Sequence, residues 1–293
     1  MTQRSHLPIL MTLAAALFWA SSFTVVKVGL RYLDPYSFVF LRFLVATALL
    51  LGVVGLRGQG RLMVNYLADR YVLLLGLTLA ASYVFQFRGQ TETTAANAVV
   101  IVNSSAVLVA PLSYLMLQEA IGARKVIALV MGLAGVYLIT RGGGARGGEP
   151  ASLAGNLLVS GSAVAYACYV VLTKMAVTRR PMSEVPMMAA VFLWSLPAFL
   201  GAALPALVRG VKVSGPAWLT IGYLAVACSI LPFIIWTAAI KRIGALTSAI
   251  VLLAELAFGV VIARIALQEA LSAGVVAGCG IVAAAVLVVG IKS

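Results

Sequence analysis

Ten apolar segments follow one another along this chain, and each is about as long as a membrane-spanning helix. A helix needs about 20 apolar residues to cross a hydrocarbon core of ~30 Å, because each residue rises about 1.5 Å. Hydrophobic residues make up 63% of the chain and charged residues only 10%, which leaves too little polar surface to coat a water-soluble globule. We therefore expect an all-α integral membrane protein with ten transmembrane helices. The expected spans are 8–31, 36–56, 71–89, 94–117, 124–141, 153–174, 184–207, 217–239, 245–267 and 272–291.

The connections between these spans are too short to form a soluble domain, which excludes functions that need one. The glycine-rich stretch 142–148, within RGGGARGGEP, lacks the Lys-Ser/Thr of a phosphate-binding loop, so we interpret it as a linker. The one histidine, His6, lies in the N-terminal tail, and Cys168, Cys228 and Cys279 stand apart in different spans. The sequence contains no clustered metal ligands and no motif that pairs a nucleophile with a base, so we expect no metal, no cofactor and no enzymatic activity.

The positive charge indicates how the chain is oriented. A formal net charge of +13 would suggest nucleic acid as the partner of a soluble protein, but here the expected loops place more Lys and Arg on the side of both tails, including Arg124–Lys125 and Lys241–Arg242. The positive-inside rule then predicts that both termini are cytoplasmic. The first span is too long for a signal peptide, so we expect an uncleaved helix. We predict a multi-pass protein of the cell inner (plasma) membrane, whose partners are the lipid bilayer and a small-molecule substrate, not nucleic acid.

The two halves of the chain resemble each other. The sequence LQEA at 117–120 recurs at 267–270, and Trp19 with Lys27 corresponds to Tyr166 with Lys174. Five helices per half is an odd number, so corresponding helices cross the membrane in opposite directions. We predict two inverted five-helix repeats, 1–141 and 153–293, joined by a Gly-rich linker at 142–152. Inverted repeats can open a central site to one side and then to the other, which favours a transporter; a duplicated channel or scaffold stays an alternative.

Two stretches also resemble the paired signatures of a known family. ALFWASSFTVVKVGLRYLDPYSFVFLRFLVA (15–46) and LMLQEAIGARKVIALVMGLAGVYLI (115–139) are similar to those of the EamA family in the drug/metabolite transporter superfamily. The chain departs from that family at Ala20, Gln118 and Gln268, where Gly is frequent. Within the family it looks most similar to YddG-type exporters of aromatic and other neutral amino acids. The resemblance implies ten helices, a central cavity and efflux from the cytoplasm.

Polar and aromatic side chains within the spans are the candidates for substrate binding, because polar groups that face lipid would stay unpaired. An aromatic wall with scattered amides and hydroxyls suits a small zwitterion with an apolar side chain, and it suits sugars or polyanions poorly. For each polar candidate the alternative is a hydrogen bond to a neighbouring helix. The candidates are Trp19, Ser22, Tyr83, Gln86, Phe87, Asn97, Asn103, Ser104, Tyr166, Tyr169, Trp194 and Trp236.

One acidic residue, Glu255, stands in the middle of the apolar run AIVLLAELAFGVV (249–261). A carboxylate at the centre of a membrane helix costs at least ~2.5 kcal/mol, so we expect it to face the interior and to be protonated or paired. Three roles stay open: a structural hydrogen bond, proton coupling, or contact with a substrate ammonium group. Lys27 and Arg42 are possible partners from other helices, whereas Arg264 lies about 13 Å away along the same helix.

Together with what the resemblance implies, these patterns favour a secondary transporter that exports small neutral or aromatic amino acids across the bacterial inner membrane by alternating access. The alternatives are a carrier of other specificity, such as nucleosides or cationic drugs, and a passive pore. Small residues spaced by four, Ala128 with Gly132 and Gly274 with Gly278, predict that the fifth and tenth spans pack closely, away from the cavity. Both a monomer and a homodimer fit that surface.

Overall fold

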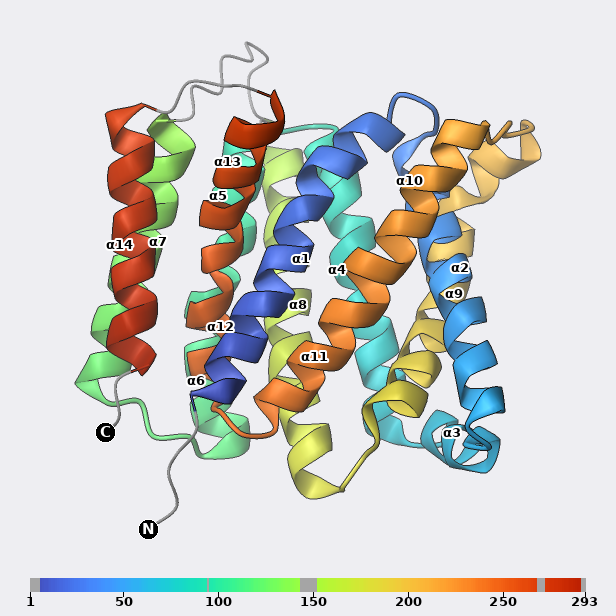
Figure 1. The fold of residues 1–293 in the computed structure, drawn as a ribbon, viewed down its shortest axis with the longest axis horizontal. Coiled ribbons are helices and arrows are strands. Elements are labelled where there is room, and N and C mark those ends of the chain that lie inside the picture. The colour runs from blue at the N-terminus through green and yellow to red at the C-terminus, as the bar shows by residue number, and fades with distance from the viewer. Residues whose placement is uncertain (1–5, 94, 143–151, 268–271, 291–293) are drawn as a thin grey trace.

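The computed structural model describes residues 6–93, 95–142, 152–267 and 272–290, and it contains no strand in these ranges (Figure 1). Ten helical spans are long and apolar enough to cross a membrane. The prediction of an all-α protein with ten transmembrane helices is thereby confirmed.

The helices follow the predicted spans closely, and several begin at a residue that caps the first turn. The side chains of Asp34, Asp69, Ser152 and Ser214 each accept a hydrogen bond from a backbone N–H of the helix that follows. The helices are α1 (Leu7–Gly29), α2 (Pro35–Leu56), α3 (Gly60–Leu67), α4 (Arg70–Gln90), α5 (Ala95–Asn103), α6 (Ser105–Leu117), α7 (Ala123–Gly142), α8 (Leu153–Arg179), α9 (Glu184–Val208), α10 (Gly215–Ala225), the π-helix η1 (Val226–Ile230), α11 (Leu231–Ile240), α12 (Ala245–Leu252), α13 (Ala254–Leu267) and α14 (Ala273–Gly290).

Three of the predicted spans are not continuous α-helices. The fourth span breaks at Ser104 between α5 and α6, and the ninth breaks at Leu253 between α12 and α13. At both breaks the backbone tightens locally: Ser104 N donates to Ile101 O at 3.2 Å as well as to Val100 O, and Leu253 N donates to Ile250 O at 3.2 Å. The eighth span passes through η1, one turn before Pro232. Breaks therefore fall at corresponding places in the two halves, near mid-span.

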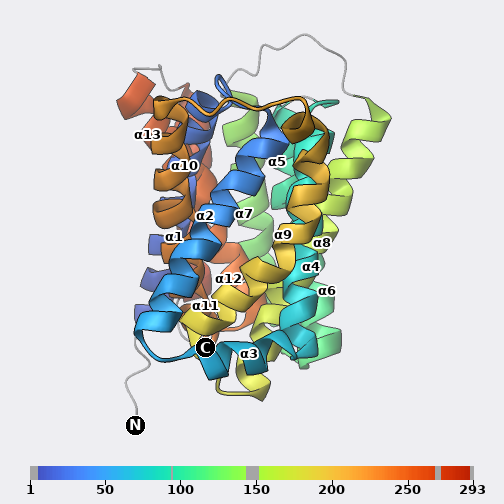
Figure 2. The same ribbon diagram turned by 90° about the vertical axis from the view of Figure 1, so that its right-hand side faces the viewer.

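The expected loop between the second and third spans contains a short helix, α3. It has no buried residue and packs against α9 on the side where the chain begins (Figure 2). A short helix that lies across the ends of the spans fits the interface between lipid and water. The sequence analysis placed a connection here and did not predict this helix.

The described ends of the chain lie on the same side of the molecule (Figure 1). A Cβ added at Gly290 would lie 3.3 Å from Ile9 Cδ1, which places the end of α14 beside the start of α1. We call this side the terminal side and the other the far side. Helix α1 runs from the terminal side to the far side, whereas α8, the first helix of the second half, runs the opposite way (Figure 1).

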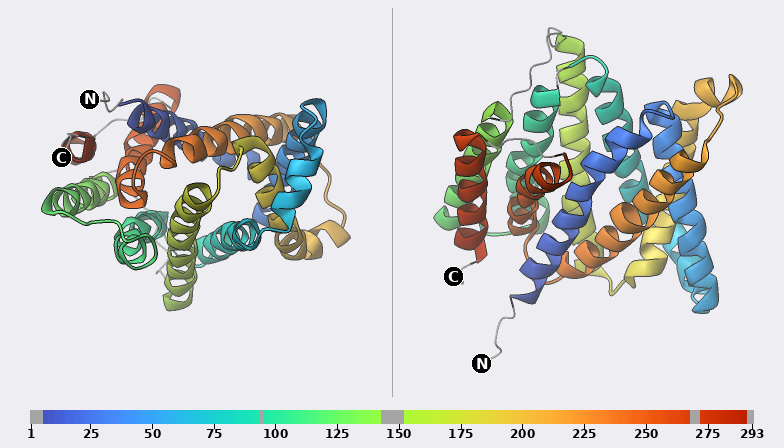
Figure 3. Two further views of the ribbon diagram at one scale, coloured as in Figure 1. Left: turned by 90° about the horizontal axis from the view of Figure 1, so that it is seen from below. Right: turned by 45° about the horizontal axis from the view of Figure 1, so that its top comes forward.

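The helix contacts repeat between the halves. Helices α7 and α14 pack together as a pair at one edge, and α2 packs against α9 (Figure 3). Helix α4 packs against α8, and its counterpart α11 packs against α1. Helix α8 also contacts α6, just as α1 contacts α13. If each span is replaced by the corresponding span of the other half, five spans along the chain, the same set of helix contacts results.

The α7–α14 pair meets at glycine. A Cβ on Gly278 would lie 2.7 Å from Gly135 O, and a Cβ on Gly135 would lie 2.7 Å from Gly278 O. Backbones this close need glycine on both helices. Gly278 thus packs at the seam as predicted, but its partner is Gly135, because Gly132 faces Leu253 instead.

Candidate functional site

A cavity of about 240 Å³ lies between the two halves of the bundle. Its walls come from α1, α2, α4, α5 and α6 of the first half and from α8, α11, α12 and α13 of the second. No described residue of α7 or α14 lines it. Small metabolites bind in concave pockets of this kind.

The cavity has aromatic, amide, hydroxyl and charged groups on its wall. Many of the residues that the sequence predicted for substrate contact lie there, on α1, α4, α5, α8 and α13. These residues are Trp19, Ser22, Tyr83, Gln86, Phe87, Asn103, Tyr166 and Glu255.

Other predicted residues lie off the cavity wall. Asn97 is exposed on α5. Ser104 sits at the break in the fourth span, where its hydroxyl donates to Ile101 O at 2.6 Å, and its neighbour Ser105 lines the cavity instead. Trp194 lies on α9 and donates through Nε1 to Leu67 O at 3.1 Å, which ties α9 to α3. Ser104 and Trp194 thus form hydrogen bonds within the protein, away from the cavity wall.

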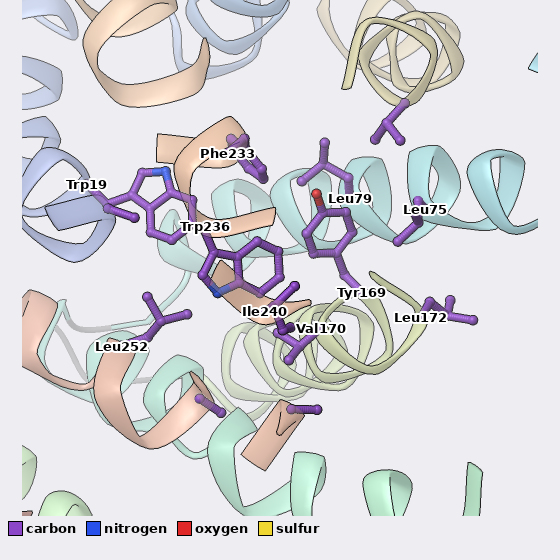
Figure 4. Packing of buried hydrophobic residues seen from close by; sticks show 14 of the residues in the cluster. Trp19, Leu75, Leu79, Tyr169, Val170, Leu172, Phe233, Trp236, Ile240 and Leu252 are labelled. Carbon is purple, nitrogen blue, oxygen red and sulfur yellow. The ribbon is translucent and has the colours of Figure 1, made fainter. Parts of the chain in front are cut away.

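Tyr169 and Trp236 also lie off the cavity wall, and both are fully buried among other apolar side chains (Figure 4). They come three residues after Tyr166 and Phe233, which do line the cavity, on helices that run toward the terminal side. The rings of Tyr169 and Trp236 stack with centroids 5.9 Å apart. Trp236 Nε1 donates to Ser248 Oγ at 2.7 Å, which fixes the indole against α12.

Phe233 completes this aromatic layer. Its ring lies edge-on to Trp19, with centroids 5.1 Å apart, and edge-on to Tyr169, with centroids 6.0 Å apart. Figure 4 shows the four rings of Trp19, Phe233, Tyr169 and Trp236 together, and we call this layer the aromatic floor. Tyr169 and Trp236 lie about one helical turn closer to the terminal side than Tyr166 and Phe233, so the floor is on the terminal side of the cavity.

Polar contacts join the helix ends below this floor. Glu119, in the loop after α6, accepts a hydrogen bond from Ala245 N at the start of α12, at 2.9 Å. Lys174 donates to Ile240 O at 2.9 Å and lies close enough to Glu119 for an electrostatic interaction. The LQEA motif of the first half therefore attaches to the second half on the terminal side.

Two ion pairs lie on the same side. Lys241 pairs with Glu184 and also donates to Met182 O at 2.7 Å. Arg180 pairs with Asp69 at 2.8 Å. These contacts join the end of α11 to the start of α9 and the end of α8 to the start of α4 on the terminal side.

Arg42 is a cavity residue that the sequence indicated only as a possible partner of Glu255. Its side chain is 4% exposed, and it enters the cavity from α2. Nε donates to Ser229 Oγ and Nη2 donates to Cys228 O, both at 2.7 Å. Proline has no N–H to offer the carbonyl four residues earlier, and for Pro232 that carbonyl belongs to Cys228. The distorted turn of η1 thus supplies an acceptor that holds the guanidinium in place.

Aromatic rings flank the same guanidinium. Its carbon lies 5.4 Å from the ring centroid of Phe43 and 5.9 Å from that of Tyr83. Contacts of this kind favour a cation. Of the five N–H groups of an arginine, the described bonds to Ser229 and Cys228 use two, which leaves donors for the cavity.

Glu255 lies on the cavity wall in the first turn of α13. It is close enough to Arg42 for an electrostatic interaction, yet within the described ranges it forms no ion pair of 4.0 Å or less. The side chains of Lys27 and Arg264, which the sequence analysis considered as its partners, lie outside the described residues. Trp19 adds a second polar group to this part of the wall, since its buried Nε1 has no partner among the residues described.

Comparison with known proteins then identifies the family. The sequence profile of the EamA-like transporter family matches residues 6–141 and, a second time, residues 153–291. The chain belongs to the EamA-like transporter family. As a member of this family, with ten apolar spans, it is a multi-pass membrane transporter.

Relatives agree with this assignment. A chain of Archaeoglobus fulgidus, described as an uncharacterized transporter, is 30% identical over 92% of this chain and 91% of its own length. The uncharacterized transporter YvbV of Bacillus subtilis is 32% identical over 54% of this chain and 50% of its own. A solved crystal structure has the same fold, with a TM-score of 0.80 over 96% of this chain and 95% of that chain, at 21% identity.

One departure from the EamA-like pattern has a clear structural setting. Gln118, which stands where the family frequently has Gly, ends α6 with φ of 55°, in the left-handed region. Glycine adopts this conformation without steric cost, and other residues do not. The turn after α6 therefore has a backbone conformation that suits glycine, although glutamine occupies this position.

Proposed function

We propose that this EamA-like transporter exports small neutral or aromatic amino acids across the bacterial inner membrane by alternating access. The observation that carries the proposal is a cavity shared by both halves, lined with aromatic rings, amides and opposite charges, and closed on the terminal side. A small zwitterion with an apolar side chain matches both the chemistry and the size of this space.

Alternating access is supported by the relation between the halves. The family profile matches each half separately, and the helix contacts are unchanged when each span is exchanged with the one five positions later. The breaks at Ser104 and Leu253 correspond as well. Two similar halves of opposite direction can exchange conformations, which would close the far side and open the terminal side.

The direction of opening follows from the predicted topology. With both termini cytoplasmic, the aromatic floor and the polar contacts of Glu119 and Lys241 close the cytoplasmic side. The cavity lining instead reaches residues near the far-side ends of their helices, such as Val26 and Gln90. The structure then corresponds to an outward-facing state, from which substrate leaves.

The alternatives fit less well. A cationic drug could contact Glu255 but would leave Arg42 without an anionic partner, and an uncharged nucleoside would leave both charged groups without one. A passive pore needs a continuous path, whereas a stacked aromatic layer separates this cavity from the terminal side.

Counterflow in proteoliposomes tests the proposal. Purified protein is reconstituted into vesicles loaded with unlabelled tryptophan, phenylalanine or threonine, and uptake of the same labelled amino acid is measured. We expect the loaded vesicles to take up label faster than vesicles loaded with buffer, because a carrier exchanges substrate and a pore does not. If none of the three labelled amino acids enters the vesicles above the level of protein-free vesicles, the proposed substrate class is contradicted. If label enters at equal rates into loaded and unloaded vesicles, the carrier mechanism is contradicted.

A further inference from the structure

We propose that Arg42 and Glu255 recognise the two charges of an amino acid separately: Arg42 binds the α-carboxylate, and Glu255 binds the α-ammonium group. This inference rests on the proposed function and adds to it the groups that select for a zwitterion. It predicts that molecules with only one of the two charges bind weakly.

The first observation is that the two charged groups share one cavity without forming a direct pair. Both side chains line the cavity, and they interact electrostatically, but no ion pair of 4.0 Å or less joins them among the described residues. An α-carboxylate and an α-ammonium group are separated by a single carbon. We expect a zwitterion between Arg42 and Glu255 to place its carboxylate beside Arg42 and its ammonium group beside Glu255, so that each charge has an opposite neighbour.

The second observation is that Arg42 is held ready for an anion. Ser229 Oγ and Cys228 O fix its Nε and Nη2 from behind, while Phe43 and Tyr83 flank it. A guanidinium held in this way loses little conformational freedom when it binds a planar carboxylate through its remaining N–H groups. The support comes from the π-helix η1, so the site depends on the distortion at Pro232.

The third observation concerns two polar groups of the cavity wall, the Glu255 carboxylate and the indole N–H of Trp19. A carboxylate in a membrane interior is costly unless a cation compensates it, and a substrate ammonium group can do so. Trp19 is 7% exposed, and its Nε1 has no acceptor among the described residues, so the wall also offers an unused donor beside the aromatic floor. A ligand with acceptor and donor ends would satisfy both groups.

The test uses molecules that differ from phenylalanine by one charge. 2-Phenylethylamine lacks the carboxylate, and 3-phenylpropionate lacks the ammonium group. Each competes with labelled phenylalanine for counterflow by the full-length protein. We expect both to compete roughly tenfold to a hundredfold more weakly than phenylalanine, because each leaves one buried charge without a partner. If either one competes as well as phenylalanine, the inference is overturned, and this result requires no mutant.

Two variants then assign the charges. In Glu255→Gln the preference for phenylalanine over 3-phenylpropionate is expected to fall to within a few-fold, with the preference over 2-phenylethylamine retained. In Arg42→Gln the opposite pattern is expected. Gly280→Ala serves as a control, because a Cβ at Gly280 meets nothing within 4 Å. If both variants keep both preferences, the assignment fails even though amino-acid transport stands.

The substrate class is tested independently of this selectivity. If phenylalanine gives no counterflow and threonine does, the same design uses threonine with 1-amino-2-propanol and 3-hydroxybutyrate, which lack one charge each. If no amino acid gives counterflow, the proposed function fails, and the inference fails with it. If amino acids are transported without charge selectivity, only the inference fails.

Discussion

At the scale of single residues, Gln118 allows a test of backbone conformation that is independent of transport. A non-glycine residue in the left-handed region costs roughly 1 kcal/mol, so Gln118→Gly is expected to raise the free energy of unfolding by about that amount. Thermal unfolding in detergent measures the change. Gln118→Ala is the matched control, because it removes the side-chain bond from Nε2 to Leu115 O but keeps the strained backbone. Equal stability of the Gly and Ala variants would show that φ of 55° carries no cost here.

Ser229 gives a second prediction at this scale, because it positions Arg42. Ser229→Ala removes the acceptor of Arg42 Nε, so apparent affinity for phenylalanine is expected to fall roughly three- to tenfold. Competition by 2-phenylethylamine, which lacks a carboxylate, is expected to stay unchanged. Ser195→Ala is the control, since that buried hydroxyl donates within its own helix, to Phe192 O. An equal loss for both ligands would indicate general damage to the fold instead.

The position of the cavity residues could be predicted from sequence only in part. Polar and aromatic residues in apolar spans are easy to find, and Trp19, Tyr83 and Glu255 do lie on the cavity wall. Residue type does not reveal which side of a helix faces the cavity, so Trp236 was grouped with them although it lies beneath the wall. Their contact with a substrate stays a prediction. The hydrogen bond that holds Arg42 could not be predicted from sequence, because its acceptor, Cys228 O, is 186 residues away in the chain.

At the scale of helices, the α7–α14 pair depends on glycine at its closest approach. Gly278→Ala would place a Cβ 2.7 Å from Gly135 O, so we expect it to destabilise the protein by roughly 1–3 kcal/mol. Gly280→Ala, on the same helix, meets nothing within 4 Å and is expected to be tolerated. Thermal unfolding of the two variants in detergent compares them directly. A similar loss of stability for both would contradict close packing at Gly278.

The spans themselves were predictable, and their interruptions were not. About 20 apolar residues in a row leave the backbone no alternative to a helix in lipid. The breaks at Ser104 and Leu253 carry no local signal, because neither position is glycine or proline and serine also occurs within regular helices. Helix α3 was not predicted, because its eight residues are too few and too polar to suggest a membrane segment. Contacts between helices, and not local sequence alone, determine where such breaks and short helices occur.

At the scale of the whole molecule, the ten-span architecture followed from hydrophobicity, and the internal repeat was visible in the LQEA motif at 117–120 and 267–270. The state of the transporter did not follow from sequence. We expect it to depend on contacts between distant segments, such as the hydrogen bond from Ala245 N to Glu119 on the terminal side. The second copy of the motif, at 268–270, lies outside the described residues.

We expect the contacts on the terminal side to set the balance between the outward-facing state and a state that is open to the terminal side. Ala249 lines the cavity, so Ala249→Cys in a protein without Cys168, Cys228 and Cys279 can be labelled by a membrane-impermeant thiol reagent. We expect rapid labelling from the far side and slow labelling from the terminal side. Adding Glu119→Ala removes the bond to Ala245 N and the carboxylate near Lys174, so terminal-side labelling should rise roughly tenfold or more.

Glu92→Ala is the matched control for this experiment. Glu92 forms an ion pair with Arg88 at 2.8 Å, and that pair lies at the far-side end of α4. It should leave the terminal-side labelling rate unchanged. The two variants remove the same type of charge from opposite ends of the bundle, so a selective effect of Glu119→Ala would locate the closure below the aromatic floor. An unchanged terminal-side rate in Glu119→Ala would show that the aromatic layer alone keeps this side closed.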